Sequence, residues 1–410
     1  MSSHKIAVMG YGVVGSGVVE AFYQSYESMK RKISHSLDIK YILDIVEHKE
    51  TSFDEKFISD FEIIVNDPEI TVVAEVIGGI NPAYDYTKRC LEAGKSVVTS
   101  NKELVATKGA ELLKIASENG VKYLFEASVG GGIPIIRPLR YCLIGNNIEK
   151  ICGIVNGTTN FILTRMFEDK MSFEDALSLA QKLGYAERNP SADVDGHDAC
   201  RKICILSSLI LGKHIYPDEV HTEGISSIKS EDVEAAASIS HTIKLIAYCK
   251  KLDNNKMQVI VAPMLVNSQS RLSNIKDVFN GVTVLGDAVD EVSFYGRGAG
   301  KLPTASAVVS DILECVRLAD VKEPPLWNDG SHDVVIDHEK GSFPFFLRFK
   351  ATDSAKDNLV SLLGEPTLIE EQNNQLLFIT NPVMEEKFDK AVNELKQRGE
   401  EIYSTFRVLY

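Results

Sequence analysis

The sequence predicts an α/β protein in which a doubly wound parallel sheet is followed by an α+β domain and a small βαββαβ tail. Three observations lead to this class. Short β-rich runs alternate with helical patterns over the first 130 residues, as in parallel sheets covered by helices. A glycine-rich turn, Gly10–Gly15, joins the first strand to the first helix. After Gly130 the strands and the helical stretches between them lengthen, which indicates a mixed sheet faced by helices.

The first domain, residues 1–130, takes its strands from short runs rich in Val and Ile and its helices from the stretches between them. The expected strands are Lys5–Met9, Ile39–Ile45, Val72–Ile77, Ser96–Thr99 and Lys122–Glu126. The expected helices are Val13–Ser28, Pro82–Ala93 and Leu104–Asn119.

The second domain, residues 131–320, is expected to be α+β. Its strands include Ile148–Val155 and Met257–Val266. Its helices are Phe173–Lys182, Asp198–Leu211, Val233–Cys249 and Thr304–Ala319. The last helix either belongs to this domain or packs back on the first.

A polar segment with two prolines and a glycine predicts a linker over residues 321–342. The tail, residues 343–410, alternates strand and helix patterns. Its expected elements are, in order, Phe343–Ala351 (strand), Ala355–Leu363 (helix), Gln375–Thr380 (strand), Glu385–Arg398 (helix) and Tyr403–Leu409 (strand).

The composition disfavours several classes of function. The 44 basic and 58 acidic residues give a net charge of −14, which disfavours nucleic acids and anionic membranes as partners. No apolar run reaches the roughly 18 residues of a membrane span, and a strand pattern that begins at Lys5 leaves no room for a signal peptide. Seven cysteines without zinc-ligand spacing fit reduced thiols. We therefore expect a cytoplasmic protein without a nucleic-acid or membrane partner.

The turn Gly10-Tyr-Gly12-Val-Val-Gly15 lies between a strand and a helix, which is the context of the Rossmann dinucleotide fingerprint. Gly10 permits the tight turn, Gly12 lets backbone approach a pyrophosphate, and Gly15 allows close packing of helix on strand. The N–H groups of Val13 and Val14 at the helix N-terminus would hold the phosphates. The sequence therefore predicts a nicotinamide dinucleotide as cofactor.

Asp44, at the end of the second strand, is expected to accept hydrogen bonds from the adenosine ribose hydroxyls. A carboxylate there would repel a 2′-phosphate, which favours NAD over NADP. The alternative is an ordinary aspartate of a strand-end turn.

Two lysines stand in positions suited to proton transfer. Asp198 and Lys202 are four residues apart at the start of an apolar helix, so they share one face, where the pKa of the lysine can be tuned. Lys102 follows a strand, at the edge where ligands bind in doubly wound sheets, and can stabilise negative charge on a reacting oxygen. The alternatives are a surface ion pair and a solvated loop lysine.

Taken as a set, six further blocks resemble homoserine dehydrogenase in their residues and their order. They are Glu75–Gly79, Thr99–Ala106, Glu126–Pro134, Asn156–Asn160, Gly184–Glu187 leading to Asp193–Lys202, and Phe294–Thr304. The resemblance covers roughly residues 4–320. It implies a reversible NAD(P)-dependent interconversion of L-homoserine and L-aspartate 4-semialdehyde, on the route to threonine and methionine.

The resemblance also implies residue roles. Lys202 matches the acid/base residue, Asp198 the residue that orients substrate and lysine, and Lys102 a lysine that polarises the reacting oxygen. Glu187 matches the ligand of the substrate's amino group, with Asp193 close by. The remaining matches are Gly157 and Thr158 for substrate, and Gly78, Gly79, Ser100, Gly184, Gly298 and Gly300 for cofactor.

The Glu126 block resembles a site for a monovalent cation, Na⁺ or K⁺. Its ligands would be the Glu126 side chain and the carbonyls of Val129, Gly131 and Ile133. The alternative is a glycine-rich hinge between domains. The resemblance favours a homodimer formed through the second domain, with a tetramer through the tail as the alternative. The tail resembles an ACT domain in the order of its elements, and a packing or oligomerisation module is expected, with threonine feedback as the alternative.

The sequence disfavours three other functions. A non-catalytic dinucleotide-sensing regulator on the same frame would lose the lysines or Asp198, and this chain keeps them. A kinase–dehydrogenase fragment is disfavoured, because no kinase block precedes Gly10. A semialdehyde dehydrogenase needs a nucleophilic cysteine beside a base, and Cys142 and Cys152 have no histidine near them in sequence.

Overall fold

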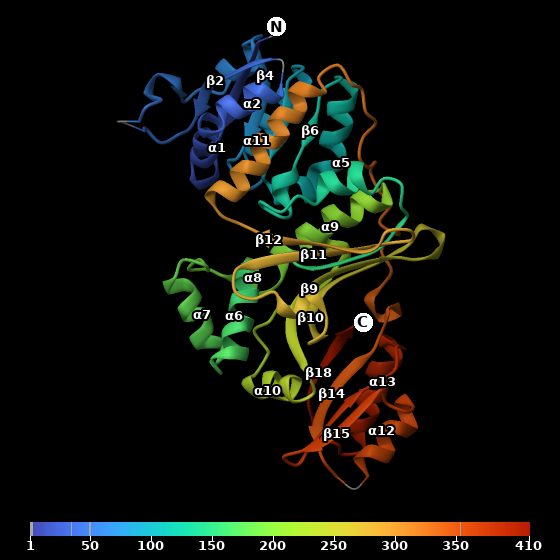
Figure 1. Ribbon diagram of the computed structural model, residues 1–410. Helices are drawn as coiled ribbons and strands as arrows, with labels where there is room; N and C mark the ends of the chain where they lie inside the picture. The colour runs from blue at the N-terminus through green and yellow to red at the C-terminus, as the bar shows by residue number, and fades with distance from the viewer. Residues whose placement is uncertain (1–2, 34, 49–50, 353) are drawn as a thin grey trace. The chain divides into compact units, whose positions relative to one another are not determined.

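The computed structural model describes residues 3–33, 35–48, 51–352 and 354–410, and they form two compact units (Figure 1). The first unit comprises Met1–Ile148, Cys204–Pro217 and Leu285–His332. The second comprises Glu149–Ile203, Asp218–Val284 and Asp333–Tyr410. None of the helices in the described ranges combines the length and the hydropathy needed to cross a membrane.

The first unit is built on a six-stranded parallel sheet with the strand order β3-β2-β1-β4-β5-β6. This is the order of a Rossmann sheet, and it reverses between β1 and β4, where such sheets bind their ligands. The strands are β1 (Ser3–Met9), β2 (Ser36–Leu43), β3 (Phe57–Ile58), β4 (Ile70–Glu75), β5 (Ser96–Thr99) and β6 (Tyr123–Leu124). This unit also holds β12 (Asp290–Arg297). The predicted fold class is confirmed for this part of the chain.

Helices cover the sheet of the first unit. They are α1 (Val13–Gln24), α2 (Tyr26–Lys32), α3 (Glu62–Asn66), α4 (Ala83–Glu92), α5 (Lys102–Glu118) and α11 (Lys301–Arg317). Figure 1 shows α11, late in the sequence, running beside α1. Val18 and Phe22 of α1 and Val308 of α11 share one buried cluster with the strands. The helix expected at Thr304–Ala319 thus packs within the first unit, because its apolar face completes the core of that sheet.

The second unit contains a mixed sheet in which the neighbouring strands are β11-β7-β9-β10-β18-β14-β16-β15, with β8 also pairing with β10. They are β7 (Ile148–Ile154), β8 (His221–Thr222), β9 (His241–Lys251), β10 (Met257–Asn267), β11 (Phe279–Gly286), β14 (Phe345–Lys350), β15 (Leu368–Gln372), β16 (Gln375–Ile379) and β18 (Ile402–Leu409). A separate pair joins β13 (Ser342–Phe343) and β17 (Val383–Met384).

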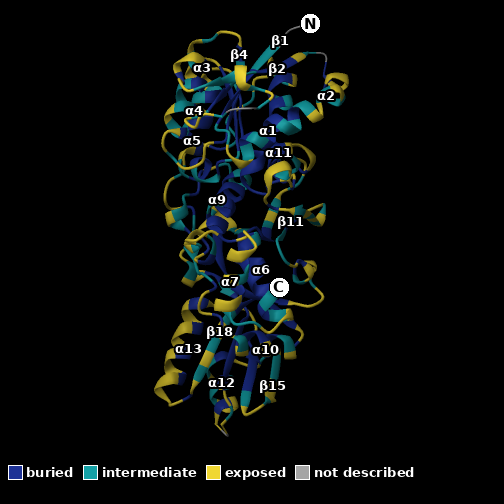
Figure 2. Cartoon of the chain, turned by 90° about the vertical axis from the view of Figure 1, so that its left-hand side faces the viewer, coloured by how far each residue is buried: buried dark blue, intermediate teal, exposed yellow. Residues whose placement is uncertain are grey.

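The helices of the second unit are α6 (Gly157–Glu168), α7 (Phe173–Lys182), α8 (Ser191–Val194), α10 (Ser230–Ser238), α12 (Ala355–Leu363) and α13 (Glu385–Gln397). A further helix, α9 (His197–Leu211), begins in this unit, and the chain passes to the first unit within it. Figure 2 shows the strands of both sheets mostly as buried residues, with exposed residues concentrated on helices and loops.

The tail has the predicted βαββαβ order, but its strands continue the sheet of the second unit. β18 pairs in parallel with β10, so that Met264 lies opposite Arg407, and β14 pairs antiparallel with β18. The four-part division into residues 1–130, 131–320, 321–342 and 343–410 stays a prediction, whereas the compact units cut across it. Within the expected linker, Trp327 is 1% exposed and its indole N–H donates to His214 (2.9 Å).

One predicted helix, Val233–Cys249, was wrong. Helix α10 ends at Ser238, Ser240 takes a left-handed conformation (φ 59°), and the chain continues as strand β9. The first nine residues of β9 are all buried, so the run lacks the apolar–polar alternation that identifies a half-exposed strand. For the same reason β11, whose residues are nearly all buried, was not predicted.

Candidate active site

The glycine turn of the first unit lies at the end of β1, where the strand order of the sheet reverses. Gly10 has φ 98°, a conformation that favours glycine. A Cβ on Gly15 would lie 1.9 Å from the carbonyl oxygen of Gly10, so only glycine fits this close approach. Gly12 has open space above it, and Val13, the first residue of α1, is 69% exposed. The N-terminus of α1 is therefore open to a phosphate group.

Asp44 follows β2, next to the glycine turn. Its carboxylate accepts the backbone N–H of Tyr11 (2.7 Å) and of Val46 (2.9 Å), and His48 lies 3.4 Å away. Burial opposes ionisation, but these three contacts outweigh it and lower the pKa of Asp44 below its usual value. The side chain is thus an oriented anion beside the glycine turn. A residue that binds the hydroxyls of the adenosine ribose would need to lie in this way.

The loops after β4 and β5 are joined by a buried hydrogen-bond network that the sequence analysis missed. Glu75, at the end of β4, accepts the N–H of Ile77 (2.8 Å) and the hydroxyl of Thr99 (2.7 Å). Asn101 caps α5 by accepting the N–H of Leu104 (3.1 Å), and its amide donates to the carbonyl of Gly79 (2.6 Å). The sequence did contain a signal for this network, because Glu75 is a carboxylate at the end of an otherwise apolar strand.

This network places the predicted residues of both loops. Gly78 and Gly79 have positive φ values and open space above them, and Lys102 is the first residue of α5. Ser100 precedes the cap residue and its carbonyl accepts the N–H of Lys102 (3.1 Å). Lys102 therefore stands at the carboxyl edge of the sheet, as expected.

In the second unit, Asp198 and Lys202 form an ion pair with an Nζ–Oδ2 distance of 2.7 Å. Both residues are buried, with exposures of 4% and 7%, so the alternative of a surface pair is wrong. The ammonium of Lys202 also donates to the carbonyl of Val155 (2.6 Å). The lysine is thus held by two oxygen acceptors at the start of α9.

Asn156, which the sequence analysis named only as part of a block, connects this pair to Asp193. Its amide donates to Asp193 (2.7 Å) and to Asp198 (2.9 Å), while its oxygen caps α6 by accepting the N–H of Thr159 (2.8 Å). Burial, together with the nearby charge of Asp198, raises the pKa of Asp193. Two carboxylates, one lysine and one amide therefore form a single cluster.

The other predicted substrate residues differ in their relation to this cluster. Gly157 and Thr158 begin α6, directly after Asn156, and the hydroxyl of Thr158 donates to the carbonyl of Tyr185 (2.7 Å). Glu187 is exposed, and among the described residues its carboxylate has no contact with the cluster. Gly184 has φ 77°, in a turn after α7.

The late glycine loop lies within the first unit. Gly300 has φ 122° and precedes α11. A Cβ on Gly131 would lie 2.4 Å from the carbonyl oxygen of Gly298, so these two glycines approach each other closely. This loop leads into the helix that packs on α1.

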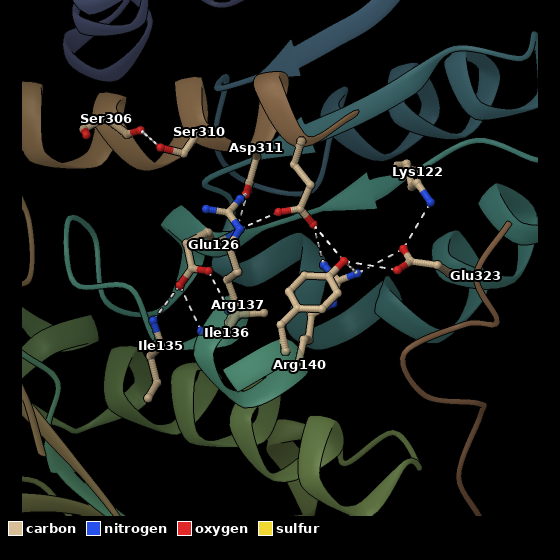
Figure 3. Close-up of polar contacts among 12 residues, drawn as sticks. Lys122, Glu126, Ile135, Ile136, Arg137, Arg140, Ser306, Ser310, Asp311 and Glu323 are labelled. Carbon is tan, nitrogen blue, oxygen red and sulfur yellow. Dashed lines mark hydrogen bonds and ion pairs between the residues drawn. The ribbon is translucent and has the colours of Figure 1, made fainter. Parts of the chain in front are cut away.

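Figure 3 shows the polar contacts around Glu126, whose side chain is one of the predicted cation ligands. The buried carboxylate accepts the N–H groups of Ile135 (2.7 Å), Ile136 (2.9 Å) and Arg137 (2.7 Å). Arg137 also forms an ion pair with Asp311 (2.7 Å), and burial raises the pKa of Asp311 to about 8. Three of the roughly four acceptor sites of the Glu126 carboxylate are therefore used by backbone donors.

The described residues contain no group of three or more His, Cys, Asp or Glu side chains arranged to hold a metal ion. A cation in this loop would depend mainly on the carbonyls of Val129, Gly131 and Ile133. Backbone oxygens of this kind suit a hard monovalent ion. The predicted set of ligands, the Glu126 side chain and these three carbonyls, stays a prediction.

The open helix terminus and the anchored Asp44 suit the first unit to a nicotinamide nucleotide, and the second unit supplies a buried lysine paired with a carboxylate. The chain is an NAD(P)-dependent oxidoreductase. Residues 10–126 match the family model described as the NAD-binding domain of homoserine dehydrogenase, and residues 134–313 match the model described as homoserine dehydrogenase. The chain belongs to the homoserine dehydrogenase family.

Individual relatives support this membership. The homoserine dehydrogenase of Bacillus subtilis is 40% identical over 320 residues, which are 77% of this chain and 74% of the relative. That of Pseudomonas aeruginosa is 34% identical over 421 residues, covering 97% of this chain and 96% of the relative. A crystal structure of a homoserine dehydrogenase from Thiobacillus denitrificans has a TM-score of 0.92 at 31% identity, covering 100% of this chain and 99% of that chain.

The activity is NAD(P)-dependent homoserine dehydrogenation in the aspartate family of amino-acid biosynthesis, as the resemblance implied. The alternatives of a silent regulator and of a semialdehyde dehydrogenase are set aside by these matches.

Proposed function

We propose that Lys202 is the acid/base residue of this dehydrogenase and that Asp198 orients it. The observation that carries this assignment is the buried ion pair of 2.7 Å, joined through Asn156 to a second carboxylate. A lysine amine can give or take a proton when it lies within hydrogen-bond reach of the reacting oxygen.

When homoserine is oxidised, the bound nicotinamide supplies the hydride acceptor. Lys202, in its neutral form, takes the proton of the substrate hydroxyl at Nζ. In the reverse reaction its ammonium returns a proton to the oxygen that was the aldehyde carbonyl. Asp198 favours the charged form of Lys202 and thereby stabilises the enzyme after the proton has moved. The role that the resemblance implies for Lys102, stabilising negative charge on a reacting oxygen, is kept as part of the proposal.

The substrate carries an ammonium and a carboxylate, and the second unit offers a partner for each. Asp193 is half-buried beside Asp198 and would pair with the ammonium, with the exposed Glu187 as a second anion. The N–H groups of Gly157 and Thr158 lie in the first turn of α6, where the helix dipole favours a carboxylate.

Asp44 supports a preference for NAD, because its oriented negative charge beside the glycine turn would repel a ribose 2′-phosphate. The alternative is NADP, since the solved structure of a hyperthermophilic archaeal homoserine dehydrogenase mutant, 28% identical, is a complex with NADPH. A Na⁺ or K⁺ ion held by the Glu126 side chain and the carbonyls of Val129, Gly131 and Ile133 remains part of the proposal.

The cell compartment and the assembly are also proposed. Six of the seven cysteines are buried, which is compatible with a reduced cytoplasmic protein. A homodimer formed by the second unit is the expected assembly, and light scattering on the eluting protein measures its mass. A monomeric mass would contradict it.

The catalytic assignment is tested by following absorbance at 340 nm with homoserine and either NAD or NADP. Lys202→Met should lower kcat by about 10²- to 10⁴-fold, the usual contribution of a general acid/base residue. Lys182→Met, at an exposed position of α7, is the control and should retain kcat within about twofold, because exposed substitutions are usually near neutral. A Lys202→Met enzyme with unaltered kcat would show that this lysine does not transfer the proton.

A further inference from the structure

The turn that carries Asp193 is packed against a second segment, residues 221–225, that comprises β8 and the three residues after it. The N–H of Ile225 donates to the carbonyl of Val194 (2.8 Å). A Cβ on Gly224 would lie 2.5 Å from that same oxygen, and a Cβ on Gly196 would lie 2.9 Å from Cγ2 of Thr222. The two segments therefore touch through backbone, with no space between them to absorb a displacement.

This contact lies next to the proposed substrate site. The N–H of Gly196 donates to the carbonyl of Asp193 (3.0 Å), and the N–H of Cys200 donates to Gly196 (2.9 Å) at the start of α9. A shift of the 221–225 segment would therefore move Asp193 relative to Asp198.

The 221–225 segment is held in place by the C-terminal tail. β8 and β18 occupy the same edge of β10, because β9 pairs along the whole of the other edge. Arg407 of β18 can consequently reach Glu223, and its Nη1 donates to Oε1 of Glu223 (2.7 Å). The N–H of Glu223 donates to Val261 of β10 (2.8 Å), which fixes the backbone as well.

The Arg407 side chain is buried and is also hydrogen-bonded to a helix of the tail. It is 6% exposed, its Nε donates to Glu385 of α13 (3.0 Å), and its Nη2 forms a second bond to the same carboxylate. His221 lies 2.7 Å from Glu223. Burial opposes ionisation of Glu223, but His221 and Arg407 outweigh it and lower its pKa to about 2. One guanidinium therefore bridges two carboxylates, and its loss would remove the positive charge that they share.

We propose that Arg407 and Glu223 are positioning residues through which the C-terminal tail holds Asp193 in place for the substrate ammonium. The proposal rests on the proposed role of Asp193. Neither side chain touches the substrate in this account. Their effect reaches it through the backbone contact of the 221–225 segment with the turn at residues 193–196.

The chain contains a matched control for a merely structural role. Arg348 of β14 pairs with Asp232 at 2.8 Å, and the Arg348 and Arg407 side chains are equally buried, at 6% and 7% exposure. The partners of Arg348 are Asp232, Ser404 and Gln375. None of them belongs to the 221–225 segment or to the turn at residues 193–196.

The experiment compares Arg407→Gln with Arg348→Gln, measuring KM for homoserine, KM for the cofactor, kcat and Tm on the full-length enzyme. Both variants should lower Tm. Arg407→Gln should raise the KM for homoserine about tenfold, the size of a typical coupling between sites. Arg348→Gln should leave that KM within about twofold of wild type. Neither variant should change the KM for the cofactor by more than about twofold.

A second pair of variants keeps the test decisive if Arg407→Gln does not fold. Glu223→Gln, matched by Asp232→Asn, removes the other partner of each ion pair and should reproduce the KM difference. Adding Glu223→Gln to Arg407→Gln should reverse part of the rise in the KM for homoserine. The double variant has a neutral amide in place of one of the two carboxylates that Arg407 bridges.

Asp193→Asn separates the two hypotheses. If it leaves the homoserine KM unchanged, the role of Asp193 is wrong and the present inference fails with it. If Asp193→Asn raises KM while the variants at Arg407 and Glu223 behave like their controls, the proposed function stands and the positioning role alone is overturned.

Discussion

Asn156 organises the proposed substrate site at the scale of single residues. One amide group donates to Asp193 and Asp198 and caps α6 with its oxygen. Two carboxylates close together repel each other, so a donor shared between them is needed to hold both near Lys202. The sequence analysis named Asn156 only as part of a block, because its partners lie 37 and 42 residues away.

The variant Asn156→Asp separates these two functions. Aspartate is as good a helix cap as asparagine, but it replaces the shared donor with a third negative charge. We expect kcat/KM for homoserine to fall by at least about tenfold, the cost of leaving a buried charged group without its partner. Steady-state kinetics with homoserine varied would measure this. Ser172→Asp, which changes the cap of α7, is the control, and equal kcat/KM for both variants would contradict the prediction.

The proposed influence of Asp44 on the choice of cofactor is also local. Because its pKa is lowered, its charge persists throughout the neutral pH range. Replacing Asp44 by arginine should shift the ratio of kcat/KM for NADP over NAD by at least about tenfold, since a unit charge at 4 Å contributes about 1–4 kcal/mol. Asp85→Arg on α4 is an exposed control in the same unit. An unchanged ratio would remove the ribose assignment.

At the scale of secondary structure, strand β9 shows how burial hides a pattern. Its residues are buried on both faces, and Lys244 lies among them with 3% exposure. The ammonium donates to the amide oxygen of Asn160 (2.9 Å) and to the carbonyl of Ile275 (2.7 Å), both of them neutral acceptors. Burial consequently lowers the pKa of Lys244 from 10.5 to about 8.

This lowered pKa gives a stability effect with a definite sign. The unfolded chain binds the proton of Lys244 more tightly than the native protein does, so stability attributable to this group rises with pH between about 8 and 10.5. Relative to Lys244→Met, the wild type should gain up to about 3 kcal/mol of unfolding free energy over that range. Urea unfolding of both proteins at several pH values measures the difference. Lys251→Met, at the exposed end of β9, is the control, and its unfolding free energy should vary with pH as that of the wild type does. The same pH dependence in Lys244→Met and wild type would refute the prediction.

At the scale of the whole molecule, the tail supplies strands to the sheet of the second unit. β18 covers part of one edge of β10, and Phe345, Leu347 and Phe349 of β14 are buried in the same cluster as Met264 and Val266 of β10. An apolar face and an unpaired strand edge would be exposed without the tail.

Truncation after residue 342 tests whether residues 343–410 are a separate domain. If they are part of the sheet, the shortened chain should aggregate, which size-exclusion chromatography would show as loss of the native peak. Deleting only Tyr410, which is 58% exposed, should leave elution unchanged. A shortened chain that elutes as a folded, active enzyme would support the four-domain division instead.

The sequence alone determined features that depend on neighbours a few residues apart. The glycine turn between β1 and α1 and the i,i+4 pair of Asp198 and Lys202 are of this kind, because strand–turn–helix geometry and the helical repeat act over such distances. Tertiary structure decided the rest. It buried the ion pair, brought Asn156 to both carboxylates, occupied Glu126 with backbone donors and joined the tail to β10. Burial and long-range pairing depend on which segments meet in three dimensions, and no local periodicity encodes that choice.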